Sequence, residues 1–119
     1  MKTMGNHIHA AVLRALAAEA GLDVTDRQKP ILVIEEIRIV DWASATFIGA
    51  RHEIDVRLEG PQPGTDNAVE RLVQGIAERD IVIAGHIVAE IGVSLVEQSK
   101  AIVNLSVQSL TVNVLTIID

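Results

Sequence analysis

Four histidines, at positions 7, 9, 52 and 86, are the side chains in this sequence best suited to acid-base or metal chemistry. His86 and Glu90 would share one face of a helix, where both could ligate a metal ion. Residues 81–93, however, alternate aliphatic side chains in a pattern that predicts a strand. Four residues along a strand span about 13 Å, too far for two ligands of one ion. We therefore expect no metal site there and a partly exposed His86.

His52 precedes Ile54 and Val56 on the apolar face of another predicted strand. One interpretation is a neutral core histidine with a hydrogen-bonded ring nitrogen, because an unpaired buried nitrogen costs about 1–3 kcal/mol. The other is a general base whose pKa is tuned by burial. The nearest carboxylates in sequence, Glu53 and Asp55, are predicted on the opposite face of that strand. This placement weakens a catalytic dyad built from neighbouring residues.

The other candidate motifs are short and incomplete. His7 and His9 would lie about 6.6 Å apart on an extended chain, close enough to share a metal, but on a helix they diverge by about 200°. No third ligand lies nearby in the sequence, so we expect no native metal site. Ser44 and Thr46 have no nucleophile elbow around them, and Ser44 is interpreted as a turn residue. No dinucleotide, P-loop, zinc-protease or EF-hand spacing occurs, so no cofactor is predicted.

A row of alternating charges is more informative. Arg51, Glu53, Asp55 and Arg57 are spaced by two residues, which places them on one face of a strand about 6.6 Å apart. Such a row is either a solvated sheet face or a wet interface that could hold a partner or a ligand. The polar residues expected to join it from other strands are His86, Glu90, Asn104, Ser106 and Gln108.

Two helices are predicted to support these residues. The first spans residues 6–20, with Asn6 as N-cap and Gly21 just past the end. The second is expected to begin near Asn67, after a loop at 60–65, with Glu70 in a capping box. Its buried side is predicted to carry Val69, Leu72, Val73 and Ile76.

The four strands are predicted from alternating apolar residues, at 31–40, 45–58, 81–93 and 101–117. Residues 41–44 are expected to form a turn that carries Trp42. Glu35 fits neither face of its strand, which indicates a bulge or an edge position. The third strand is predicted to place Ile81, Ile83, Ile87, Ala89 and Ile91 on one face, and His86, Val88 and Glu90 on the other.

The element order is helix, strand, strand, twice over, which predicts one α+β domain over residues 1–119. This order is a circular permutation of the ferredoxin-like pattern, with the first strand moved to the end. The permutation predicts a four-stranded sheet in the order third, fourth, second, first, with both helices on one face. His52 and His86 would then lie on separated strands, and we expect their rings on opposite faces.

Composition narrows the classes of function. Ten Lys and Arg against 16 Asp and Glu give a net charge of −6, which repels phosphate backbones, so nucleic-acid binding is disfavoured. No apolar run approaches the roughly 18 residues of a membrane span, and no secretory leader opens the chain. The absence of cysteine suits a reducing compartment. We expect a soluble cytoplasmic protein with no membrane partner.

Two segments resemble a family of small, uncharacterised bacterial proteins. In WASATFIGARH the matching residues are Trp42, Ser44, Thr46, Phe47, Gly49, Arg51 and His52. In GHIVAE they are Gly85, His86, Val88, Ala89 and Glu90. That family has no assigned activity, so the resemblance implies a relative and no function.

Two functions are compatible with these patterns. The first is a non-enzymatic module for binding or assembly, a homo-oligomer that uses its open sheet face or a strand edge. The alternative is a small-molecule enzyme, with His52 or His86 as a general base and Arg51 or Arg57 holding an anionic substrate. The enzyme requires a pocket that contains at least one of the two histidines.

Overall fold

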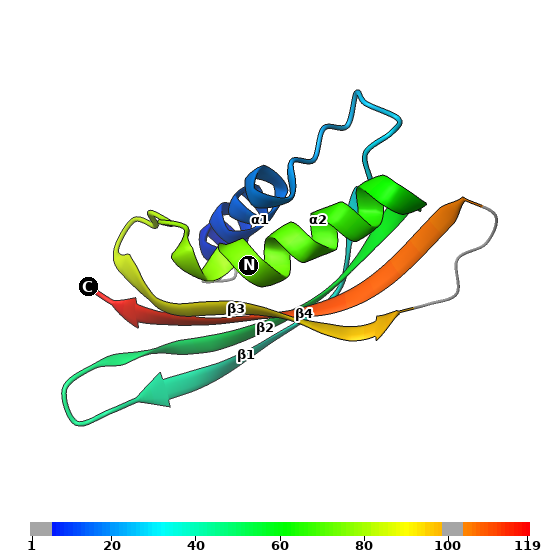
Figure 1. Ribbon diagram of the computed structural model, residues 1–119. Helices are drawn as coiled ribbons and strands as arrows, with labels where there is room; N and C mark the ends of the chain where they lie inside the picture. Colours follow the sequence, from blue (N-terminus) through cyan, green and yellow to red (C-terminus); the bar gives the residue numbers. More distant parts are fainter. Residues whose placement is uncertain (1–5, 99–103) are drawn as a thin grey trace.

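Two helices lie on one face of a four-stranded antiparallel sheet in the computed structural model, which describes residues 6–98 and 104–119 (Figure 1). Within those ranges no helix covers the other face of the sheet. The elements are α1 (Asn6–Ala20), β1 (Ile31–Ala43), β2 (Ile48–Pro61), α2 (Gln62–Gly75), the 3-10 helix η1 (Ile76–Glu78), β3 (His86–Gln98) and β4 (Leu105–Ile118). The order β1-β2-β4-β3 is the predicted one, and the α+β class is confirmed. The relation to ferredoxin-like proteins by permutation stays a prediction.

Helix α1 has the bounds that the sequence predicts. It ends at Gly21, whose φ of 70° is a left-handed conformation that glycine adopts without steric cost. The Leu22 N–H donates to the Ala17 carbonyl at 2.9 Å, and the Gly21 N–H donates to the Ala18 carbonyl at 3.2 Å. These two bonds satisfy carbonyls that a helix end leaves without partners.

Helix α2 begins five residues before the predicted start. The expected loop at 60–65 does not exist as a loop, because β2 runs to Pro61 and the helix follows at once. Pro63 stands in the first turn, where its missing N–H has no partner to lose. The capping box at Glu70 was therefore a wrong prediction, since Glu70 lies in the middle of the helix. Of the four apolar residues predicted on its buried side, Val69 and Leu72 are buried, Ile76 is buried in the following helix η1, and Val73 is 48% exposed.

The β1–β2 hairpin is longer than predicted. Trp42 lies in the ladder, paired with Gly49, and not in the turn. The turn follows at Ser44, whose hydroxyl accepts a hydrogen bond from the Phe47 N–H at 3.1 Å. The β1–β2 register shifts between Ile34 and Glu36, so the bulge predicted at Glu35 is present, and β1 is also an edge strand.

Strand β3 begins five residues after its predicted start. A turn at Ala84 and Gly85, with φ of 77° at the glycine, separates it from the Ile81–Ile83 segment. A register shift between Val88 and Glu90 then inserts one extra residue into the strand. A bulge changes which face the following residues occupy. The predicted faces of β3 are therefore wrong: Val88 and Ile91 both pack against the core, and Ile87 is exposed.

The core lies between the helices and the sheet. Ile54, Val56 and Leu58 of β2 are fully buried there, and they alternate with charged residues as the sequence predicts. The rest of the core comes from β4 and the helices, chiefly Leu110, Val112, Val114, Val12, Leu16 and Leu72.

Candidate functional site

All four histidines meet near the first turns of α1, on the helix side of the sheet. His9 of α1 and His52 of β2 are hydrogen-bonded, with Nε2 of His9 3.0 Å from Nδ1 of His52. The other ring nitrogen of His52, Nε2, lies 3.0 Å from the Thr116 hydroxyl of β4. The two rings meet edge to face, with centroids 5.0 Å apart. One chain of hydrogen bonds therefore links the helix to both central strands.

The hydrogen-bonded rings of His9 and His52 are neutral at pH 7. Burial lowers the pKa of His9. Burial, and after it the positive charges of His9 and His86, lower the pKa of His52 to about 4. Two neutral rings can share the 3.0 Å bond because one N–H donates while the other nitrogen accepts. If both rings were positively charged imidazolium ions, the two facing nitrogens would both be donors and the hydrogen bond would be lost.

The second pair is His7 of α1 with His86 of β3, whose ring centroids are 5.4 Å apart. Nδ1 of His86 donates to the Ala84 carbonyl at 3.1 Å. The expectation that His52 and His86 lie on opposite faces is wrong. Because Ala89 is bulged, His86 and Val88 face the helices while Glu90 faces away from them. Among the described residues, no three histidine or acidic side chains are arranged to hold a metal ion.

The order Thr116, His52, His9 is the order of a nucleophile, a base and an orienting group. Thr116 is 1% exposed and His52 is 2% exposed, so both groups are sealed from substrate. Three cavities of about 350, 420 and 540 Å³, each above the roughly 300 Å³ scale of ligand sites, have no histidine among the described residues that line them. The arrangement joins helix α1 to the two central strands through buried hydrogen bonds.

The open face of the sheet carries a network of charges around Arg38 of β1. Its guanidinium contacts Asp55 through two nitrogens, at 2.8 and 3.0 Å, and it also bonds Glu53 at 3.0 Å and Glu36 at 2.8 Å. The register explains this, because Arg38 pairs directly with Glu53. Hydrogen bonds from Arg38, and also from Thr111, lower the pKa of Asp55.

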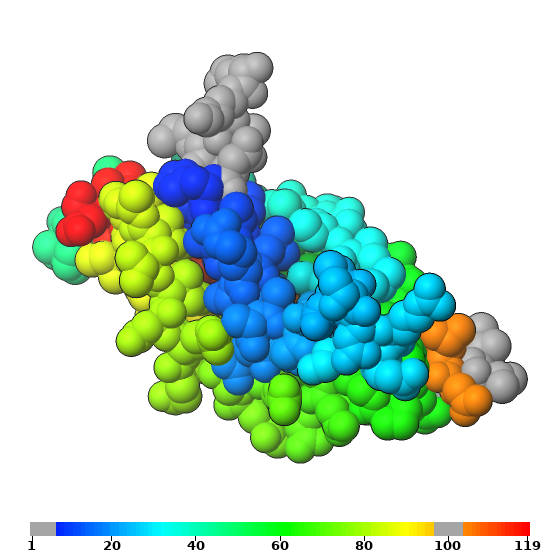
Figure 2. Space-filling model, turned by 90° about the horizontal axis from the view of Figure 1, so that it is seen from above, coloured from blue at the N-terminus to red at the C-terminus, as the bar shows by residue number. Residues whose placement is uncertain are grey.

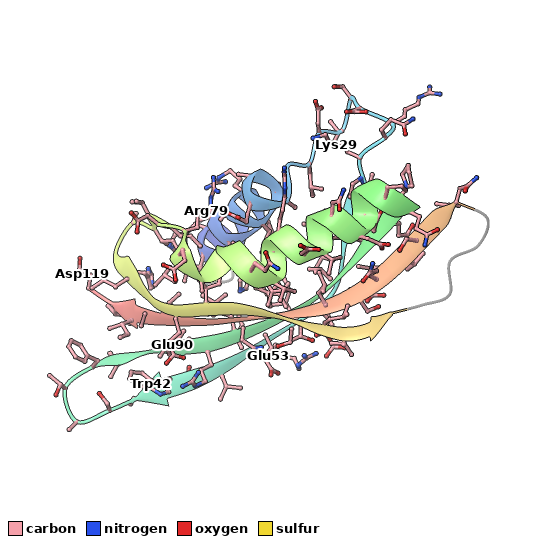
Figure 3. All side chains as sticks on the ribbon, in the orientation of Figure 1. Lys29, Trp42, Glu53, Arg79, Glu90 and Asp119 are labelled. Atoms are coloured by element: carbon pink, nitrogen blue, oxygen red, sulfur yellow. The ribbon has the colours of Figure 1, made fainter. Side chains whose placement is uncertain are left out.

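The predicted charged row of β2 lies on this open face, as expected. Arg57 bonds Glu35 at 2.7 Å and also contacts Glu59. Arg51 of β2 and Glu90 of β3 are on strands separated by β4, and their side chains meet at 3.6 Å. Both residues pair in register with Leu115, which is only 5% exposed although it lies outside the main core. Figure 3 shows Glu53, Glu90 and Trp42 on the side away from the helices.

Three residues predicted to share the open face lie on the helix side, and a fourth precedes β4. His86 faces α1, as described above. Ser106 and Gln108 are buried and donate hydrogen bonds to the Asp66 carboxylate of α2, Ser106 at 3.1 Å. Asn104 lies in the turn before β4, where its carbonyl accepts from the Gln62 N–H at 2.9 Å. The faces of Ser106 and Gln108 were predicted wrongly because polar residues were assigned to the solvent side. In the structure Asp66 of α2 supplies a hydrogen-bond acceptor for both on the helix side.

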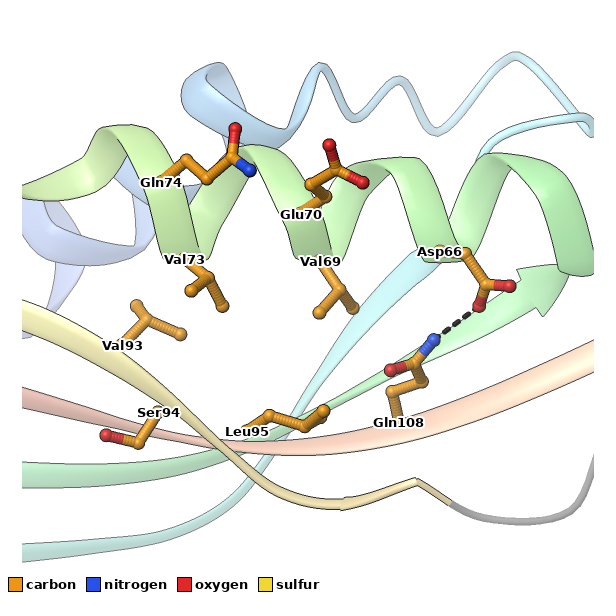
Figure 4. Close-up of a pocket in the computed structure, with 9 residues that line it drawn as sticks. All are labelled: Asp66, Val69, Glu70, Val73, Gln74, Val93, Ser94, Leu95 and Gln108. Atoms are coloured by element: carbon orange, nitrogen blue, oxygen red, sulfur yellow. Dashed lines mark hydrogen bonds between the residues drawn. The ribbon is translucent and has the colours of Figure 1, made fainter.

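A groove of about 420 Å³ lies between α2 and β3 (Figure 4). Val69 and Val73 form its helix side, and Val93 and Leu95 form its strand side. The hydrogen bond between Asp66 and Gln108 closes one end. The groove is open and mainly apolar.

Comparison with solved structures supports the fold of this chain. No protein-family model matches the chain, and no curated protein matches its sequence. The chain is similar to one chain of a solved structure, "Virion of native gene transfer agent (GTA) particle", with a TM-score of 0.60 and 13% identity. The alignment covers 98% of this chain and 99% of that chain. The sequence resemblance to small bacterial proteins stays a prediction.

Sequence reasoning missed two central residues of these sites. Arg38 was visible as part of an alternating strand, but its partners on β2 depend on the register. Thr116 lies in an apolar segment, and its contact with His52 joins residues 64 positions apart.

Proposed function

We propose that this protein is a structural subunit that associates with copies of itself in a larger assembly. The observation that carries the proposal is the set of exposed large aliphatic side chains on the two edge strands. On β1 these are Ile31, Ile34, Ile37, Ile39 and Val40, and on β3 they are Ile87, Leu95 and Val96. Long edge strands with exposed aliphatic residues associate unless another surface covers them.

Two further observations support self-association. The open face presents mixed charges, which suit a wet protein contact more than an anionic partner. The similar solved chain belongs to a virion particle, which is a multi-subunit object. A cytoplasmic location without nucleic-acid contact is part of the same proposal, on the basis of the −6 charge and the absence of cysteine. No helix of the described residues is long and apolar enough to cross a membrane.

The enzyme alternative has less support. It needs a histidine beside a substrate cavity, and His52 is sealed between α1 and the sheet. His86 is partly exposed, but its ring lies against His7 and its Nδ1 is engaged by the Ala84 carbonyl.

Sedimentation velocity over a wide range of protein concentration tests the proposal. We expect a species larger than a monomer whose fraction rises with concentration. A chain that sediments as a monomer at every concentration would contradict self-association.

A further inference from the structure

Strand β1 is an exposed apolar edge. It is the outermost strand of the sheet and has 13 residues, a length of about 43 Å at about 3.3 Å per residue. Natural proteins blunt such edges with short strands, charges or bulges. In β1 the register shift with β2 falls at Glu35, and the ladder from Glu36 to Ala43 is regular. No strand of the described residues pairs with the outer edge of β1, so the regular part of that edge can accept another strand.

The apolar layer of the core continues onto β1 beyond the helices. Ile34 pairs in register with the buried Val56, Ile37 with Ile54, and Ile39 with His52. The three isoleucines therefore face the helix side, yet each remains more than a third exposed. In the space-filling view from the helix side, the cyan atoms of β1 lie beside the blue α1 and are not covered by it (Figure 2). A strand placed against β1 would extend this layer.

We propose that β1 pairs antiparallel with β1 of a second copy about a two-fold axis, joining the two sheets into one of eight strands. This inference rests on the proposed function and names the surface that serves it. A second copy fits because an isologous contact pairs two strands of equal length along their whole edges. The pairing also satisfies backbone groups that an edge strand leaves exposed.

Side-chain complementarity selects the register centred on Ile37. There Arg38 of each copy lies opposite Glu36 of the other, on the open face, and opposite charges across a ladder are stabilising. A register centred on Arg38 would instead oppose two arginines. The single extra residue at Glu35 then sets Ile39 opposite Ile34 and Val40 opposite Val33, so that apolar residues meet on both faces.

The surface area that this contact would bury is small. Five half-exposed aliphatic side chains offer on the order of 400 Å² per copy, below the roughly 800 Å² per partner of a standard interface. We therefore expect a reversible dimer whose population depends on protein concentration. This edge is one contact, and a larger assembly would use other surfaces in addition.

Two valines of equal exposure give a matched test. Val40 on β1 and Val96 on β3 are each 64% exposed, so a lysine at either site leaves the folded monomer intact. Val40→Lys is expected to raise the dimer dissociation constant by roughly tenfold or more, and Val96→Lys to leave it unchanged. The dissociation constant is measured by sedimentation equilibrium, and circular dichroism melting confirms that both variants fold.

Because the chain has no cysteine, single cysteines report the register directly. Ile37→Cys places two thiols at the axis and is expected to form a disulfide-linked dimer under mild oxidation. Leu95→Cys on the other edge is expected to form no disulfide-linked dimer, because β3 lies outside the proposed contact. If Leu95→Cys cross-links as fully as Ile37→Cys, or if Val40→Lys associates as the native chain does, β1 pairing is overturned while self-association stands. A native chain that never associates overturns both.

Discussion

His9 of α1 and His52 of β2 share a 3.0 Å hydrogen bond between buried rings, and the same His52 ring contacts Thr116 of β4 at 3.0 Å. A helix is thereby attached to the two central strands by polar groups within an apolar core. Such a link is stabilising while every member has a partner, and it becomes costly when one member is removed or charged.

Acid is expected to destabilise the fold in the range between pH 6.5 and pH 4. The pKa of His52 is lowered to about 4 in the folded state, against about 6.5 when unfolded. In that window the unfolded chain binds more protons, so stability falls as the pH falls, by about 3 kcal/mol from His52. Urea unfolding at a series of pH values measures this slope. His52→Gln should flatten it, and an unchanged slope in that variant would assign the effect to other groups.

Two buried threonines are expected to respond in opposite ways to the same substitution. Thr116→Val removes the partner of His52 Nε2 and should lower the free energy of unfolding by about 1–3 kcal/mol. Thr65, fully buried on α2, has a hydroxyl for which the described residues supply no partner. Thr65→Val should therefore be neutral or raise stability by about 1 kcal/mol. Chemical denaturation compares them, and equal losses in both variants would contradict the proposed role of the His52–Thr116 contact.

Removing Arg38 is expected to change the titration of Asp55. The hydrogen bonds from Arg38 are the main cause of the lowered pKa of that carboxyl group. Arg38→Met should therefore raise the Asp55 pKa, which carbon-detected NMR titration of the side chain measures. Arg51→Met is the control, because Arg51 forms its ion pair with Glu90. If both variants left the Asp55 pKa where it is, the network in solution would differ from the one described.

Two strand glycines are expected to differ sharply in tolerance to alanine. A methyl group at Gly49 would overlap the backbone carbonyl of Thr116, whereas at Gly92 it would meet nothing within 4 Å. Gly49→Ala should cost about 1–3 kcal/mol or more through overpacking. Gly92→Ala should be neutral or stabilise by about 0.5–1 kcal/mol, because glycine weakens a strand interior. Thermal unfolding of the two variants decides, and an equal effect would refute the close approach of β2 and β4.

The parts of the fold that could be predicted are those determined by local pattern. Alternation around Ile54 assigned both faces of β2 correctly, and Gly21 marked the end of α1. The start of α2 was missed because Pro63 reads equally as a loop residue and as a first-turn residue, and only the second holds. The faces of β3 were missed because a bulge at Ala89 leaves no mark in an aliphatic run.

The candidate sites depended on relationships that no local pattern carries. The charged row of β2 was visible in the sequence, but Arg38 became its centre only through the register of β1 against β2. The convergence of the histidines required α1 to lie over the sheet with its first turns above His52. Burial lowers the pKa of His52. The sequence indicated a buried His52 but left open whether it was a neutral core residue or a general base.

The position of β4 bears on how the chain is made. This strand lies between β2 and β3 although it follows both in sequence. Its pairing with β2 therefore joins the β1–β2 pair to the β3–β4 pair. During synthesis from the N-terminus, β2 emerges from the ribosome long before β4, the strand that completes its ladder. Until residues 105–118 leave the ribosome, the inner edge of β2 is without the strand that pairs with it. The nascent protein therefore exposes an unpaired strand edge in the period when chaperones act.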